Sequence, residues 1–266
     1  MITQLKIKLD KNVNHNKVNS LDHITVIEEI RDNIIKFSND EPEPIRNIIN
    51  NTLHTLPSVI YASPYNDTIC IYGLADNGYM AINSIFKNVL LNKTLKIKND
   101  IYKVVGIPII ESNIDFLPYN NGNINTYMTL TPINIFNNHN HKIFKAILCR
   151  HFKDGKYDKS DNIAVENFYN DIKKYALEQI KNSIRYSVST LLKKDKSCFE
   201  FIEHIEIEWD RIQLIFNHYH SQEKKMPMII GNFRSNFVLP RFLGYKIGKG
   251  FGEIMLKDNY KILRGA

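Results

Sequence analysis

The sequence has few cysteines, little glycine and no long apolar run. Its 266 residues include 3 cysteines, at positions 70, 149 and 198, and 11 glycines. The cysteines are odd in number, far apart and without a CxxC pair, which argues against a disulfide framework and against a zinc site of the usual spacing. No apolar run reaches the roughly 18 residues that a membrane-spanning helix needs, and the N-terminus lacks the apolar segment of a signal peptide. We therefore expect a cytoplasmic protein that makes no contact with a membrane.

The charge balance is moderately basic. The formal net charge is +7 and the sequence pI is about 9.1. A basic surface attracts polyanions such as nucleic acids through phosphate contacts and counterion release. The same charge can serve solubility alone, so the placement of the cations decides between the two interpretations.

The first half of the sequence alternates strand-like and helix-like segments. Apolar residues at positions 45, 48, 49 and 53 recur with a helical period, which predicts a helix from Pro44 to about Leu53. A helix is also expected over Ile24–Phe37. The other expected elements are strands over Met1–Leu9, Val59–Ala62, Thr68–Gly73, Leu95–Lys98 and Ile101–Ile110, and a helix over Tyr79–Leu91. The order β-α-β-β-α-β is that of the ferredoxin-like split βαβ unit.

A Gly- and Asn-rich segment, Pro118–Asn125, predicts a domain boundary. We expect one domain over residues 1–120 and a second over residues 126–266. The second half has a similar element order with longer connections. Its expected elements are strands over Tyr127–Phe136, Phe199–Trp209, Arg211–Tyr219 and Glu253–Leu256, a strand or short helix over Ile143–Phe152, a long helix over Asn162–Lys194 and an extended run over Met226–Leu239. The predicted fold class is α+β, with two tandem ferredoxin-like (RRM-like) domains.

The most informative segment is the tail Leu239–Ile254, which reads LPRFLGYKIGKGFGEI. It combines the glycines Gly244, Gly248, Gly250 and Gly252 with the cations Arg241, Lys246 and Lys249. Glycine permits positive φ and close backbone approach, so consecutive amides can cradle a phosphate that nearby cations neutralise. Neither a GxxxxGK[ST] loop nor a dinucleotide fingerprint is present. The alternative is a glycine-rich hairpin before the last strand, but glycines and cations together favour RNA binding.

This tail resembles the C-terminal glycine-rich loop of the CRISPR-associated repeat-processing endoribonucleases, the Cas-six family. Members read as an apolar strand, Leu-Pro, a Gly-Leu-Gly-like start and a Gly-aromatic-Gly finish. Here Gly250-Phe251-Gly252 matches the finish, whereas Phe242-Leu243-Gly244 lacks the first glycine of the start. The family has two ferredoxin-like units in tandem, as the element order predicts. The likeness is close over about fifteen residues and loose over the rest of the chain.

The resemblance implies metal-independent cleavage of CRISPR repeat RNA to mature guide RNAs. A 2′-hydroxyl attacks the adjacent phosphate and leaves a 2′,3′-cyclic phosphate. The expected partner is the repeat RNA of the crRNA precursor, with a CRISPR effector complex and a homodimer as further candidates, and no cofactor is expected. The alternatives are a repeat-RNA-binding protein of the same fold that does not cut, and a regulatory protein that binds a small molecule.

His54 is the first catalytic candidate, because family members often place a histidine after the first long helix of the N-terminal unit. An imidazole titrates near neutral pH and can act as general acid or base. Its alternative role is a cap at the C-terminal end of a helix. Tyr61 is the second candidate, to position the nucleophile, with a place in the core as its alternative. Arg46 is a candidate for RNA contact, with a solvated helix face as its alternative.

The remaining candidates are residues expected to bind RNA, possible metal ligands and a minor catalytic candidate. Arg241, Lys246, Lys249 and the four tail glycines are expected to bind RNA phosphates. The pairs His139/His141 and His218/His220 could each place two imidazoles on one side of a strand. Zinc usually requires four ligands and no companion set is present, so no metal site is expected. His151 is a minor catalytic candidate, and no GxSxG motif supports a serine nucleophile.

Overall fold

The computed structural model describes residues 2–13, 20–50, 57–112, 117–136, 141–155, 158–218 and 225–257. The chain divides into two compact units. Unit 1 comprises Met1–Leu117, Pro240–Phe242 and Lys246–Glu253, and unit 2 comprises the rest. The division after Leu117 lies beside the expected linker. The expected division differs in the tail, because most of the glycine-rich segment packs with the N-terminal unit.

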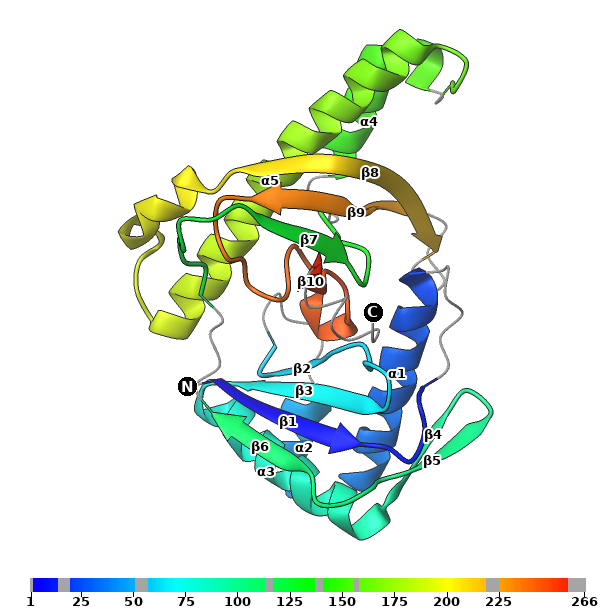
Figure 1. Cartoon of the computed structure of the whole chain (residues 1–266), viewed down its shortest axis with the longest axis vertical. Coiled ribbons are helices and arrows are strands. Elements are labelled where there is room, and N and C mark those ends of the chain that lie inside the picture. The colour runs from blue at the N-terminus through cyan, green and yellow to red at the C-terminus, as the bar shows by residue number, and fades with distance from the viewer. Residues whose placement is uncertain are drawn as a thin grey trace. The chain divides into compact units, whose positions relative to one another are not determined.

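Unit 1 is an antiparallel sheet with helices on one face (Figure 1). Its elements are β1 (Ile2–Lys8), α1 (Ser20–Phe37), α2 (Glu43–Asn50), β2 (Val59–Tyr61), β3 (Thr68–Leu74), α3 (Ala75–Asn92), β4 (Thr94–Ile97), β5 (Asp100–Lys103) and β6 (Ile109–Ser112). The sheet has the order β2-β3-β1-β6, and β4 pairs with β5 in a separate hairpin. This strand order is that of a ferredoxin-like unit, as the sequence predicts.

The two faces of β1 have different environments because side chains alternate along a strand. Leu5 and Ile7 are fully buried in the core that the sheet forms with α1 and α3. Gln4 and Lys6 lie on the other face, opposite Tyr72 and Cys70 of β3 in the strand register. This second face of the sheet carries polar and charged side chains, and the tail packs on it.

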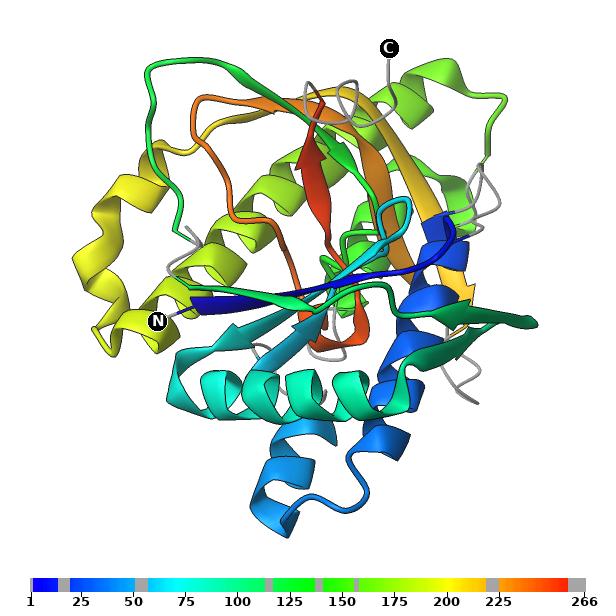
Figure 2. The same ribbon diagram turned by 60° about the horizontal axis from the view of Figure 1, so that its bottom comes forward.

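Unit 2 has a second four-stranded antiparallel sheet, seen also in Figure 2. Its elements are β7 (Asn125–Thr129), α4 (His141–His151), α5 (Asn162–Leu192), β8 (Ile207–His218), β9 (Lys225–Ser235) and β10 (Ile254–Leu256), with 3₁₀ turns η1 (Lys153–Gly155) and η2 (Lys196–His204). The order β10-β7-β9-β8 repeats the strand order of unit 1. The fold class of two ferredoxin-like units is thereby confirmed.

The connection between β9 and β10 departs from the ferredoxin pattern. In a split βαβ unit a second helix precedes the last strand. Here the described residues between β9 and β10 contain no α-helix, only the 3₁₀ turn η3 (Ile247–Lys249). The glycine-rich tail takes the place of that helix.

The prediction of a strand over Phe199–Trp209 is wrong for most of its length. Residues of the segment Phe199–Trp209 form η2 first and enter β8 only at Ile207. Phe199, Ile202 and Ile205 are all buried, three residues apart. The 3₁₀ geometry is interrupted at Phe199, which has a φ of −119° and a ψ of 44°, and Ile205 follows the end of η2 at His204.

Three other expectations changed in detail. The segment Ile101–Ile110 is divided between β5 and β6, with Gly106 at a φ of 72° between them. The expected strand Tyr127–Phe136 ends at Thr129, three residues before Pro132. The ambiguous segment Ile143–Phe152 is helical, in α4, and α5 confirms the long helix. In the described part of the chain, no helix is apolar over the length needed to cross a bilayer.

Candidate functional site

A buried ion pair joins two residues of the tail that pack with unit 1. The Nε and Nη2 atoms of Arg241 donate to Oε1 of Glu253 at 2.9 and 2.6 Å. Glu253 is fully buried, and 30% of the Arg241 side chain is exposed. Burial alone would lower the pKa of Arg241, but the adjacent Glu253 carboxylate raises it above its ordinary value. A β-bridge between Phe242 and Glu253 lies beside this ion pair, so the two contacts together close the ends of the glycine-rich loop.

The guanidinium of Arg241 lies over the sheet of unit 1. It is 5.5 Å from the centre of the Tyr72 ring, and Phe242 packs edge-on against that ring at 5.7 Å. Tyr72 accepts a 2.9 Å hydrogen bond from the amide of Gln4. Burial raises the pKa of Tyr72 and that of the neighbouring Cys70 thiol. The sheet face therefore supplies Arg241 with an aromatic surface and a neutral thiol.

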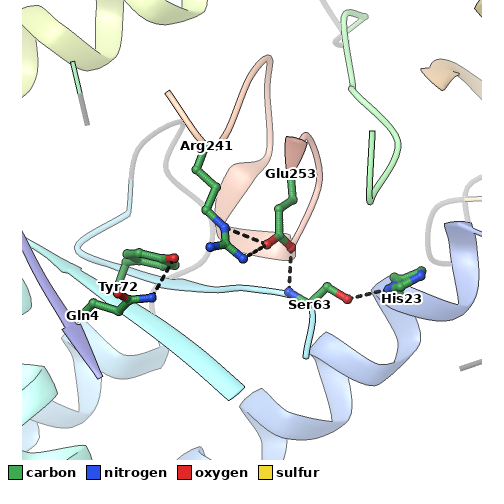
Figure 3. A network of polar contacts seen from close by, with 6 residues as sticks. All are labelled: Gln4, His23, Ser63, Tyr72, Arg241 and Glu253. Carbon is green, nitrogen blue, oxygen red and sulfur yellow. Dashed lines mark hydrogen bonds and ion pairs between the residues drawn. The ribbon is translucent and has the colours of Figure 1, made fainter. Parts of the chain in front are cut away.

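Glu253 also reaches the segment after β2, as Figure 3 shows. The backbone amide of Ser63 donates to Oε2 of Glu253 at 2.7 Å. The hydroxyl of Ser63 is 2.5 Å from Nδ1 of His23, on the first turns of α1. A chain of polar contacts thus connects the tail through Ser63 to an imidazole that is partly exposed.

The second half of the loop packs on α1. Gly250 has a φ of 84°, and a Cβ atom built there would lie 2.8 Å from Cδ1 of Ile27. Glycine is therefore required at this position both by the backbone conformation and by the close approach of the helix. Gly252 also has a positive φ, of 80°. Gly248 is buried in η3.

The first glycine of the loop packs within unit 2. Gly244 has a φ of 85° and donates its amide to the Ser183 hydroxyl at 2.9 Å. The amide of Tyr245 donates to the Asn134 carbonyl at 2.8 Å. Because these amides bond within the protein, they do not present a ready cradle for a phosphate.

The two loop lysines are half-buried. Lys246 is in the left-handed region at a φ of 60°, where η3 begins. Burial lowers the pKa of Lys246. Burial also lowers the pKa of Lys249, and so does the charge of Arg31 on α1. Both ammonium groups are therefore partly desolvated, and an anion beside them would favour the charged form.

The first catalytic candidate, His54, lies outside the described residues, in the segment 51–56. Tyr61 is described and fully buried, and its hydroxyl has no hydrogen-bond partner among the described residues. Burial raises its pKa, and this placement favours the core alternative for Tyr61. Arg46 is half-exposed on α2 and donates to the Asn39 carbonyl at 3.4 Å.

The histidine that the structure brings to the tail is His23, which sequence reasoning missed. Its sequence environment, an amphipathic helix, resembles that of an ordinary surface residue. Its partner Ser63 is 40 residues away, and Glu253 is 190 residues beyond Ser63. In the sequence, His23 is marked only as a histidine at the polar edge of the first helix. This feature is too weak to identify it as a site residue.

The other histidines give no metal centre in the described part of the chain. No group of three or more His, Cys, Asp or Glu residues there could hold a metal ion. The side chains of the pairs His139/His141 and His218/His220 lie outside the described residues. The Nε2 atom of His151 lies 2.9 Å from Asp171, which also pairs with Arg150. These contacts join α4 to α5 within unit 2.

The comparisons with known proteins point to one fold. No family model matches the chain and no curated protein matches it. Among solved structures, "Crystal structure of Cas6b" aligns with a TM-score of 0.59 at 18% identity, over 96% of this chain and 100% of that chain. "CRISPR associated protein Cas6" gives 0.52 at 13% identity, over 96% and 98%. "An RAMP protein binding different RNA substrates" gives 0.50 at 14% identity, over 96% and 99%. The chain therefore has the fold of Cas6 proteins.

Proposed function

We propose that this chain, which shares its fold with Cas6 proteins, binds CRISPR repeat RNA and cleaves it without a metal ion. The observation that carries the proposal is the tail. A buried ion pair closes a glycine-rich loop that packs on the polar face of the unit 1 sheet, and the loop carries two half-buried lysines. A desolvated ammonium group interacts strongly with a phosphate, because little water has to be removed when the two meet.

The loop glycines serve this function mainly through shape. Gly250 lets the loop approach α1, and the lysines at positions 246 and 249 then lie on either side of Gly248. We assign phosphate contacts to Lys246 and Lys249. Arg241 contributes indirectly, because its guanidinium is already hydrogen-bonded to Glu253.

The proposed reaction is an internal transesterification. The 2′-oxygen forms a bond to the adjacent phosphorus while the bond to the 5′-oxygen breaks. The products are a 2′,3′-cyclic phosphate and a 5′-hydroxyl. A base must take the proton of the 2′-hydroxyl and an acid must protonate the leaving oxygen. Lysines near the phosphate stabilise the added negative charge in the transition state. His54 remains our proposed acid, on the strength of the sequence resemblance.

A cleavage assay tests the function. The substrate is a CRISPR repeat transcript from the same genome, at protein excess and with EDTA present. We expect one cut, a 5′-hydroxyl on the downstream fragment, and no cut when the nucleotide before the site is 2′-deoxy. Binding of the 2′-deoxy RNA without cleavage of the natural RNA would instead support a protein that only binds RNA. No binding of the repeat would overturn the proposal.

Binding of the 2′-deoxy RNA tests the lysines. Lys246→Ala and Lys249→Ala should each weaken binding and reduce the slope of log Kd against log salt by roughly 1. Lys87→Ala is the matched control, because Lys87 is an exposed lysine of the same unit, on α3. Equal slopes for the loop variants and the control would show that the loop does not contact the phosphates.

A further inference from the structure

Three residues of α1 form the stripe that faces the tail. His23, Ile27 and Arg31 are four residues apart, so they lie one above the other on the same side of the helix. Gly250 packs closely against Ile27, and the charge of Arg31 lowers the pKa of Lys249. The loop therefore follows this stripe, and His23 occupies its first position.

Ser63 holds His23 at this position from a second direction. Its hydroxyl bonds to Nδ1 of the imidazole, and its own amide bonds to the buried Glu253 (Figure 3). The same residue thus fixes both the imidazole ring and the end of the loop. All of these contacts lie within unit 1.

The chemistry of this partner suits proton transfer. A hydroxyl can accept a hydrogen bond from Nδ1–H whether the imidazole is neutral or protonated. With the proton on Nδ1, the lone pair of the neutral ring is on Nε2, and gaining a proton there does not disturb the bond to Ser63. Proton transfer at Nε2 therefore needs no rearrangement of the ring.

The charged groups near this position come from α1 and from the tail. Glu28 and Arg31 follow His23 along the helix and act on the charge of Lys249, and the pair Arg241–Glu253 lies beyond Ser63. Lys249 is coupled electrostatically to Arg31, which lies about two helical turns from His23 on the same side of α1.

We propose that His23 is a catalytic residue of the RNA cleavage, the general base that takes the proton of the attacking 2′-hydroxyl at Nε2. This inference rests on the proposed function. In the proposed reaction, the 2′-oxygen gives its proton to His23 as it forms its bond to phosphorus. The departing 5′-oxygen takes a proton from a separate acid. Ser63 is a positioning residue that holds the ring.

The test is single-turnover cleavage of the repeat transcript as a function of pH, for the wild type and His23→Gln. Glutamine can keep a hydrogen bond to Ser63 but cannot transfer a proton. We expect His23→Gln to lower the rate by ~10²–10⁴-fold and to abolish the rise in rate between about pH 5 and 7. His204→Gln, at an exposed histidine of unit 2, is the matched control and should leave the profile unchanged.

Two further measurements separate catalysis from structure. The Kd for 2′-deoxy repeat RNA should be the same for His23→Gln and the wild type. A substrate with sulfur in place of the leaving 5′-oxygen needs no acid. If His23 is the base, the lowered rate of His23→Gln should therefore persist on this substrate. Restoration of the rate by this substrate would make His23 the acid and overturn the proposal. So would a wild-type pH profile in His23→Gln. If the wild type cleaves no repeat, the proposed function fails instead.

Discussion

The buried ion pair between Arg241 and Glu253 gives the most quantitative prediction. In Glu253→Gln the shape of the side chain is kept and the charge is lost. One carboxylate oxygen accepts two bonds from Arg241, and the other accepts the amide of Ser63. A glutamine has an acceptor oxygen at only one of these two positions. Its NH₂ group takes the other position and there faces a hydrogen-bond donor.

The expected cost follows from the burial of the two partners. Removing one member of a buried ion pair costs ~3–5 kcal/mol, because the remaining charge is unpaired. Since 30% of the Arg241 side chain is exposed, water can partly solvate the unpaired guanidinium. We therefore expect the lower end of the range, about 3 kcal/mol, which corresponds to a fall in Tm of roughly 10 °C.

The assay is thermal and urea unfolding of Glu253→Gln, with Glu111→Gln as the matched control. Glu111 pairs with Lys6 at 2.7 Å in the same unit, but the two side chains are 44% and 37% exposed. Such an exposed pair contributes ~1 kcal/mol or less. If the two variants unfold at the same temperature and urea concentration, the tail is not held by this ion pair and our account of the site is wrong.

Three further predictions concern other parts of the chain. Gly250→Ala should lower stability by at least ~1 kcal/mol, measured by urea unfolding, because it adds strain at a positive φ to a clash with α1; an unchanged midpoint would contradict the packing of the loop. The hydrogen bond from His151 lowers the pKa of Asp171, so this carboxylate stabilises the fold above pH ~4 and the contribution is lost as pH falls further. Asp171→Asn should therefore reduce stability by about 1 kcal/mol or less at pH 7 and by progressively less as the pH falls below ~4, and a pH-independent loss would refute the assignment. Cys149 is exposed whereas Cys70 is buried with a raised pKa, so mass spectrometry should find iodoacetamide on Cys149 first, and equal labelling of both would refute the burial.

The sequence predicted most of the regular structure, because that structure depends on local patterns. The apolar period of α5, the alternation along β1 and the break at Pro118 are all visible in short windows of sequence. The tail was also identified correctly as unusual, because four glycines and three cations within sixteen residues are an uncommon combination. The segment Phe199–Trp209 was misread because the alternation of Ile205, Ile207 and Trp209 was extended back to Phe199, whereas β8 begins only at Ile207.

The tertiary structure alone decided which unit the tail packs with and which histidine lies beside it. Those contacts connect α1, the segment after β2 and the tail, and the polar chain from His23 through Ser63 to Glu253 spans 230 residues in its two steps of 40 and 190. No local pattern encodes such a contact, because it depends on how separately formed elements pack together. Burial then sets the environment of these side chains, since it encloses the Arg241–Glu253 pair and lowers the pKa values of Lys246 and Lys249. A sequence identifies the residues that can bind RNA, and the packing determines which of them are already engaged by the protein itself.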